Sequence, residues 1–183
     1  MITQGQIAPD LTLPRDGGGT LTLSALRPQK VVLYFYPKDD TPGCTKEACT
    51  FRDLQNDLVR AKLRVVGVSP QDAESHKKFA AKHNLNFPLL ADPDKKAVKA
   101  YDVDGPLGFG VRRGTYLIGK DGRIQDSVLA DLRIGEHEQF VKTALAAGAV
   151  VHGLRQLVDE VVPAAVVHRV HGVDAQAVEV ELL

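Results

Sequence analysis

Residues 31–49 read VVLYFYPKDDTPGCTKEAC and join a buried strand to a helix that carries both cysteines of the chain. Val31–Tyr36 is an uninterrupted apolar and aromatic run, which is typical of a central strand buried on both faces. Pro37 ends this strand. Beyond a short polar loop, apolar residues recur at intervals of three and four, which predicts a helix from Cys44 to about Ala61. The first cysteine is therefore placed at the carboxyl end of a strand, where open α/β sheets bind ligands.

Strand and helix patterns alternate on both sides of this junction. Two short runs of alternating apolar residues, 11–13 and 21–23, flank Gly17–Gly19 and predict a hairpin near the N-terminus. Further strands are predicted over 63–68, 87–91, 115–118 and 123–129, and helices over 72–83, 92–101 and 135–147. This alternation predicts an α/β fold with three α/β/α layers, a mixed central sheet and an N-terminal hairpin.

The composition changes after residue 147, so we expect a core domain over 1–147 and a C-terminal extension over 148–183. The extension contains 11 valines and no lysine. Its apolar residues from Val150 to Val162 follow a helical spacing that stops at Pro163, which predicts a helix over about 149–162 and a loosely anchored end. The alternation at 178–181 is typical of a strand.

Charge and composition exclude several classes of protein. The chain has 23 Lys and Arg residues against 23 Asp and Glu residues, so its net charge of zero favours neither a nucleic acid nor an anionic membrane. Its apolar runs are too short to span a bilayer, and Met1–Gln6 lacks the basic and apolar segments of a secretory signal. Two cysteines in 183 residues fit a reducing compartment. We expect a cytoplasmic protein.

Cys44 is a candidate nucleophile because of its position in the predicted helix. Pro42 at the first helical position and Thr41 as N-cap would place Cys44 in the first turn. There the helix dipole and free backbone N–H groups stabilise a thiolate, which is the nucleophilic form of cysteine. On position alone two other interpretations stay open: a small buried apolar residue at 44, and a simple cap at 41.

The motif around this thiol resembles that of a known family. The spacing Pro37-x3-Thr41-x2-Cys44 is similar to the peroxidatic motif of peroxiredoxins. The longer run from Tyr36 to Cys49 resembles the bacterioferritin comigratory protein, or peroxiredoxin Q, subfamily in particular. The resemblance covers about residues 3–147. It implies a thioredoxin-like fold and reduction of hydrogen peroxide and organic hydroperoxides, with no metal or other cofactor.

The resemblance also implies a role for each motif residue. Cys44 would attack the peroxide and become a sulfenic acid. Thr41 would hydrogen-bond the peroxide, and Pro37 would shield the thiolate from water. Arg113 would stabilise the thiolate and polarise the O–O bond.

Two further charged residues leave alternatives open. Arg112 and Arg113 lie on opposite faces of a predicted strand, so only one of them can face the thiol, and the family register favours Arg113. Glu47 lies one helical turn beyond Cys44. Its charge would disfavour a thiolate, so a functional Glu47 must pair with an arginine that outweighs it. The alternative is a solvated carboxylate on the helix surface.

Cys49 is five residues beyond Cys44, and helix geometry limits what the two thiols can do. Five helical residues separate their Cα atoms by about 8–9 Å, whereas a disulfide needs about 7 Å or less. The resemblance implies that Cys49 resolves the sulfenic acid, so the helix must open, and that a thioredoxin or glutaredoxin-like reductant recycles the disulfide. Otherwise Cys49 is a buried helical residue. We expect a monomer, with a dimer through the extension as the alternative.

Two other functions fit parts of the sequence less well. A thiol–disulfide oxidoreductase uses Cys-x2-Cys, whereas four residues separate these cysteines. A metal-binding or redox-sensing module would need histidines near the thiols, and none lies within 20 residues of either one. His168 and His171 form only an isolated pair in the extension, where an exposed surface position is the simpler interpretation.

Overall fold

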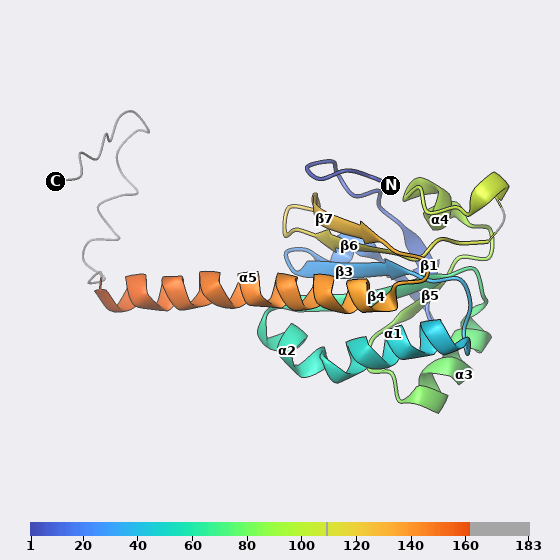
Figure 1. Cartoon of the computed structure of the whole chain (residues 1–183), viewed down its shortest axis with the longest axis horizontal. Coiled ribbons are helices and arrows are strands. Elements are labelled where there is room, and N and C mark those ends of the chain that lie inside the picture. Colours follow the sequence, from blue (N-terminus) through green and yellow to red (C-terminus); the bar gives the residue numbers. More distant parts are fainter. Residues whose placement is uncertain (109, 162–183) are drawn as a thin grey trace. The chain divides into compact units, whose positions relative to one another are not determined.

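A five-stranded mixed sheet forms the framework of the chain in a computed structural model, which describes residues 1–108 and 110–161 (Figure 1). The strands lie in the order β5–β4–β3–β6–β7, with β4 parallel to both neighbours and β6 antiparallel to both of its own. Their bounds are Lys30–Phe35 (β3), Leu63–Ser69 (β4), Leu89–Ala91 (β5), Gly114–Ile118 (β6) and Ile124–Leu129 (β7). A separate antiparallel pair, β1 (Thr12–Pro14) and β2 (Thr20–Thr22), confirms the predicted hairpin.

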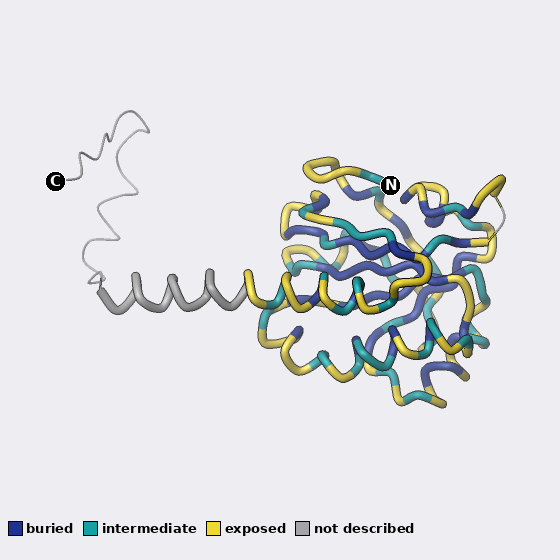
Figure 2. Tube along the Cα trace, viewed as in Figure 1, coloured by how far each residue is buried: buried dark blue, intermediate teal, exposed yellow. Residues whose placement is uncertain are grey.

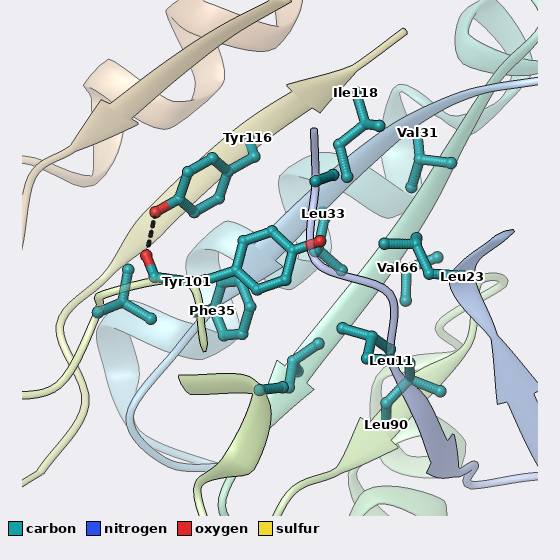
Figure 3. Packing of buried hydrophobic residues seen from close by; sticks show 14 of the residues in the cluster. Leu11, Leu23, Val31, Leu33, Phe35, Val66, Leu90, Tyr101, Tyr116 and Ile118 are labelled. Atoms are coloured by element: carbon teal, nitrogen blue, oxygen red, sulfur yellow. Dashed lines mark hydrogen bonds between the residues drawn. The ribbon is translucent and has the colours of Figure 1, made fainter. Parts of the chain in front are cut away.

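Helices cover both faces of this sheet, and the alternation of side chains along β3 separates two cores. Val31, Leu33 and Phe35 pack in one cluster with residues of α4, and the aromatic rings of Tyr101 and Tyr116 lie in that cluster (Figure 3). The opposite face of β3 packs in a second cluster with α1, α2, α3 and the first turns of α5. Figure 2 shows the resulting buried layer along the central strands. The helix bounds are Pro42–Asp53 (α1), Gln55–Arg60 (α2), Ala73–His83 (α3), Lys96–Ala100 (α4) and Ile134–Val161 (α5), with 3-10 turns at Leu23–Leu26 (η1) and Pro106–Gly108 (η2).

Two predicted helices are shorter than the sequence pattern suggested. The helix expected over 44–61 is divided at Leu54, whose carbonyl accepts from the N–H groups of both Asp57 and Leu58, a shared bond that tightens the turn. The helix expected from residue 92 begins only at Lys96. Lys95 has a left-handed backbone (φ 54°), and the Asp92 carboxylate accepts hydrogen bonds from the helix start, so 92–95 forms a capping turn instead.

The last described helix is longer than the sequence pattern predicts. Helix α5 is continuous over Ile134–Val161, where two helices, 135–147 and about 149–162, were expected. A single glycine, Gly148, interrupts an alanine-rich stretch there, and one glycine weakens a helix without ending it. The chain divides into two compact units, Met1–Leu145 and Ala146–Leu183. The predicted alternation at 178–181, His168 and His171 lie outside the described residues.

None of the described helices combines the length and the apolar character needed to cross a membrane.

Candidate active site

Cys44 lies in the first turn of α1 and is buried, with 1% of its surface exposed. Pro42 is the first helical residue and Thr41 has the extended backbone of an N-cap (φ −82°, ψ 147°), as predicted. The Thr41 side chain does not cap the helix, however. Its hydroxyl donates to the carbonyl of Lys38 at 3.1 Å, and no side-chain capping bond is formed. The hydroxyl therefore belongs to the loop beside the thiol and leaves its lone pairs free to accept.

Arg113 brings a positive charge to this thiol from the residue before β6. Its Nη2 donates to Cys44 Sγ at 3.2 Å, and its Nη1 donates to Glu47 Oε2, which lies one helical turn further along α1. The backbone N–H of Arg113 donates to Asp131 Oδ1 at 2.8 Å, and Arg112 forms an ion pair with Asp131 Oδ2 at 3.1 Å. Arg113 is 5% exposed, whereas 42% of the Arg112 side chain is exposed. Of the two candidate arginines, Arg113 is the one that faces the thiol.

Gly43 makes room for this contact. A Cβ atom at residue 43 would lie 2.8 Å from Ile134 Cδ1 and 3.4 Å from Arg113 Nη2. A side chain at this position would force the end of the Ile134 side chain to shift and would contact the guanidinium. The glycine in the motif therefore has a steric role.

Glu47 is buried, with 1% of its surface exposed, so a solvated surface position is wrong for this residue. Burial raises its pKa to about 7, against the lowering effect of the Arg113 charge. The pKa of Arg113 is also raised, which for this residue favours the charged form. Burial disfavours its charge, but the charges of Glu47 and Cys44 outweigh burial and raise its pKa. The guanidinium is thus held charged between two groups that compete for it.

His137 and Thr115 complete the cluster, and neither residue was singled out from the sequence. His137 is fully buried on α5, its Nε2 lies 3.0 Å from the carbonyl of Ala130, and its Nδ1 lies 2.8 Å from Thr115 Oγ1. The same Nδ1 lies 3.6 Å from Glu47 Oε1. Burial first, and the Arg113 charge in addition, lower the pKa of His137. We refer to Cys44, Glu47, Arg113, Thr115 and His137 as the Arg113 cluster.

A second buried polar group fixes the loop that leads into α1. Asp39 accepts hydrogen bonds from the hydroxyls of Tyr36 and Ser75, both at 2.7 Å, and lies 2.9 Å from His76 Nδ1. Its backbone N–H donates to Gln71 Oε1. Burial disfavours the Asp39 carboxylate, but the hydrogen bonds, led by that of His76, outweigh burial and hold the pKa below its usual value. We refer to Tyr36, Asp39, Gln71, Ser75 and His76 as the Asp39 network.

Pro37 and Cys49 lie at the periphery of the site. Pro37 is exposed, and its predicted role as a shield of the thiolate stays a prediction. Cys49 is half-buried on the same unbroken helix as Cys44, and both thiols are unpaired. In an intact helix their Cα atoms remain about 8–9 Å apart, beyond disulfide reach.

The mixed sheet, the cysteine in the first turn of α1 and the buried arginine beside it together define a thiol enzyme on a thioredoxin-like fold. Comparison with known proteins specifies the family. The sequence profile of the AhpC/TSA family matches residues 4–127, and the chain belongs to this family.

Named relatives and solved structures agree with this assignment. The chain is 48% identical over 126 residues to peroxiredoxin Bcp of Bacillus subtilis, covering 66% of this chain and 80% of the relative. It is 41% identical over 149 residues to the chloroplastic peroxiredoxin Q of Arabidopsis thaliana, covering 78% and 68%. The crystal structure of BcpB from Mycobacterium tuberculosis superposes with a TM-score of 0.74 at 33% identity, covering 82% and 99%. The predicted family, the thioredoxin-like fold and thiol-dependent peroxidase activity are confirmed.

Proposed function

We propose that Cys44 is the peroxidatic residue of this thiol-dependent peroxidase. Its thiolate attacks one peroxide oxygen, so that an S–O bond forms, the O–O bond breaks and the sulfur is oxidised to a sulfenic acid. The departing oxygen takes up a proton and leaves as water or an alcohol. The contact that carries the proposal is the 3.2 Å hydrogen bond from buried Arg113 to Cys44 Sγ, because a guanidinium there stabilises the thiolate and the developing charge on the leaving oxygen.

Thr41 is proposed as the group that orients the peroxide. Because its hydroxyl proton is directed at the Lys38 carbonyl, its oxygen is left as an acceptor for the O–H of a hydroperoxide. Hydrogen peroxide and organic hydroperoxides both offer such an O–H group. A solved relative from Xanthomonas campestris, with a TM-score of 0.70 and 34% identity, is described by its alkyl peroxide reduction activity, which supports organic hydroperoxides as substrates.

Cys49 is proposed as the resolving residue. Its thiolate attacks the sulfenic sulfur of Cys44, a disulfide forms and hydroxide leaves as water, but only after α1 unwinds between the two positions. The break at Leu54 supports this step, because α1 ends soon after Cys49 and a helix of 12 residues has little stability of its own. The exposed disulfide would then be reduced by a dithiol protein of the thioredoxin or glutaredoxin type. Both thiols lie on one chain, so we propose a monomer, and we propose a cytoplasmic location from the cysteine usage.

The experiment is a peroxide-consumption assay coupled to thioredoxin, its reductase and NADPH. Cys44→Ser should lose the reaction with peroxide entirely. Cys49→Ser should consume one equivalent of peroxide and then stop. Thr50→Ser changes the neighbouring helical residue conservatively and should turn over like the wild type. Normal turnover of Cys49→Ser with thioredoxin would show that Cys49 does not resolve the intermediate.

A further inference from the structure

The hydrogen bonds of His137 fix where its proton lies. A carbonyl oxygen can only accept, so the contact with Ala130 requires that Nε2 carries a proton. In a neutral ring Nδ1 is then an acceptor, and the Thr115 hydroxyl donates to it at 2.8 Å. Burial and the nearby Arg113 charge favour this neutral ring, because both lower the pKa of His137.

Glu47 leaves one of its oxygens without a partner. Oε2 accepts from Arg113, but Oε1 is buried and makes no hydrogen bond to the described residues. Oε1 lies 3.6 Å from Nδ1 of His137. If Glu47 is ionised and His137 neutral, a buried carboxylate oxygen without a donor among the described residues lies beside a ring nitrogen that can only accept, which is unfavourable. A proton between these two atoms removes the conflict.

The sum of the charges in the site also favours a proton between Glu47 and His137. Arg113 contributes one positive charge, while Cys44 and Glu47 contribute two negative charges when both are ionised, and all three residues are buried. A net negative charge in a buried cluster is costly. One guanidinium can compensate a thiolate at Cys44 fully only if Glu47 does not draw on the same charge.

We propose that Glu47 and His137 hold one proton between Oε1 and Nδ1, and that this shared proton leaves Arg113 free to stabilise the Cys44 thiolate. The inference rests on the proposed role of Cys44. His137 is therefore a positioning residue that acts through Glu47 and Arg113. The other charged groups that act on its ring are Asp131 before α5 and Glu136 on α5, both of which favour a proton there, whereas Arg113 disfavours it.

The test is the pH dependence of the reaction of the reduced protein with hydrogen peroxide between pH 5 and 9. His137→Gln keeps an N–H for the Ala130 carbonyl but has no nitrogen at the Nδ1 position. Glu47 should then ionise more readily and compete with the thiolate for Arg113. We expect the midpoint of the rate profile to move to higher pH, with a loss of rate of about three- to tenfold on the acidic side of the midpoint that disappears on its alkaline side, since a one-unit move is a tenfold change there.

Thr115→Val provides the opposite perturbation. It removes the hydroxyl that competes for Nδ1, so the shared proton should be held more firmly and the midpoint should move to lower pH. Lys142→Gln removes an exposed charge from the same helix and should leave the profile unchanged.

Opposite shifts in the two variants support the shared proton. An unchanged profile in both variants, a loss of rate that is equal at every pH, or shifts in the same direction would overturn it. If His137→Gln does not fold, the direction of the shift in Thr115→Val decides alone. Failure of the proposed function is distinguishable, because then the wild-type protein itself would show no reaction with peroxide that Cys44→Ser abolishes.

Discussion

The Asp39 network and the Arg113 cluster hold adjacent parts of one segment, and they differ in how completely their hydrogen bonds are satisfied. The network fixes the loop before α1. Both oxygens of Asp39 have donors, and the two ring nitrogens of His76 face acceptors, the Asp39 carboxylate and the carbonyl of Leu90 at 3.2 Å. These hydrogen bonds hold the pKa of Asp39 below its usual value, so the carboxylate stays ionised at neutral pH.

The Arg113 cluster holds the first turns of α1, and two of its buried polar atoms lack a hydrogen-bond partner in the part of the chain that the structure describes. Glu47 Oε1 and Arg113 Nε are buried without hydrogen-bond partners among the described residues. His137 differs from His76 because its Nδ1 contacts a hydroxyl, that of Thr115 at 2.8 Å, and not a carboxylate within hydrogen-bond distance. A fully satisfied buried network is rigid, whereas a partly satisfied one can gain or lose a proton near neutral pH. We infer that the first group positions the loop and the second adjusts charge at the thiol.

The largest expected effect comes from removing the charge that the cluster shares. Arg113→Met should lower the rate of reaction with hydrogen peroxide at pH 7 by about 10²–10³-fold, which is the typical loss when one group that stabilises developing charge is removed. Stopped-flow kinetics of the reduced protein measures it. Arg112→Met is the matched control, because Arg112 faces Asp131 and solvent, and its rate should stay within about threefold of the wild type. Equal losses in the two variants would contradict the placement of Arg113 at the thiol.

The next effect is on stability and follows from the pKa of Glu47. Because burial raises that pKa from 4.5 to about 7 in the folded protein, the folded state binds the proton more tightly than the unfolded state. Stability from this group is therefore complete below pH 4.5 and is lost as pH rises to about 7. At about 1.4 kcal/mol per pH unit the loss is about 3 kcal/mol. Glu47→Gln should remove this dependence.

Urea denaturation at pH 5, 6, 7 and 8 measures the difference between wild type and Glu47→Gln. The wild type should lose stability relative to the variant as pH rises through this range. Glu138→Gln, which removes a carboxylate paired with Lys142 on the surface of α5, should run parallel to the wild type. A wild type whose stability relative to Glu47→Gln is constant or rises with pH would show that Glu47 is ionised in the folded protein throughout.

The same contrast explains how much the sequence could reveal. The strand end, the loop and the helix start around Cys44 depend on residues close together in the chain, so period, proline and cap signals predicted them. The partnership of Arg113 with Cys44 joins residues 69 positions apart and came only from the family resemblance. No such pattern marked His137, because its burial depends on how α5 packs on the sheet. The one nearby residue that could have indicated this burial is the apolar Val141, which lies one turn later on the same buried face of α5.

Local backbone geometry accounts for the errors in the predicted helix bounds. The start of α4 depends on the left-handed conformation of Lys95, which apolar periodicity does not report. The continuity of α5 depends on one glycine that could either end a helix or lie within it. The sequence also did not predict which partner a side chain would choose for its hydrogen bond. Thr41 has the residue type and backbone position of a cap, but its hydroxyl bonds to the Lys38 carbonyl instead of the helix.

The smallest expected effect is that of a substitution in the Asp39 network, and it tests directly how this network differs from the Arg113 cluster. Asp39→Asn removes the charge that His76, Ser75 and Tyr36 surround, and should lower the free energy of unfolding by about 2 kcal/mol, the typical value of hydrogen bonds to a buried charged group. Because Asp39 has a lowered pKa, its contribution is present at neutral pH and is lost only as pH falls through that low value.

Between pH 6 and 9 the carboxylate does not titrate, so any loss of peroxide rate in Asp39→Asn should be the same factor at every pH. Urea denaturation and the pH–rate profile measure the two effects together. Asp40→Asn is the matched control, because Asp40 is the next residue but pairs with Lys82 at the surface, where ion pairs contribute little. If Asp39→Asn instead moved the midpoint of the profile, the Asp39 network would act on the charge of the thiol, as the Arg113 cluster does. Our inference that the network only positions the loop, while the cluster adjusts charge, would then be wrong.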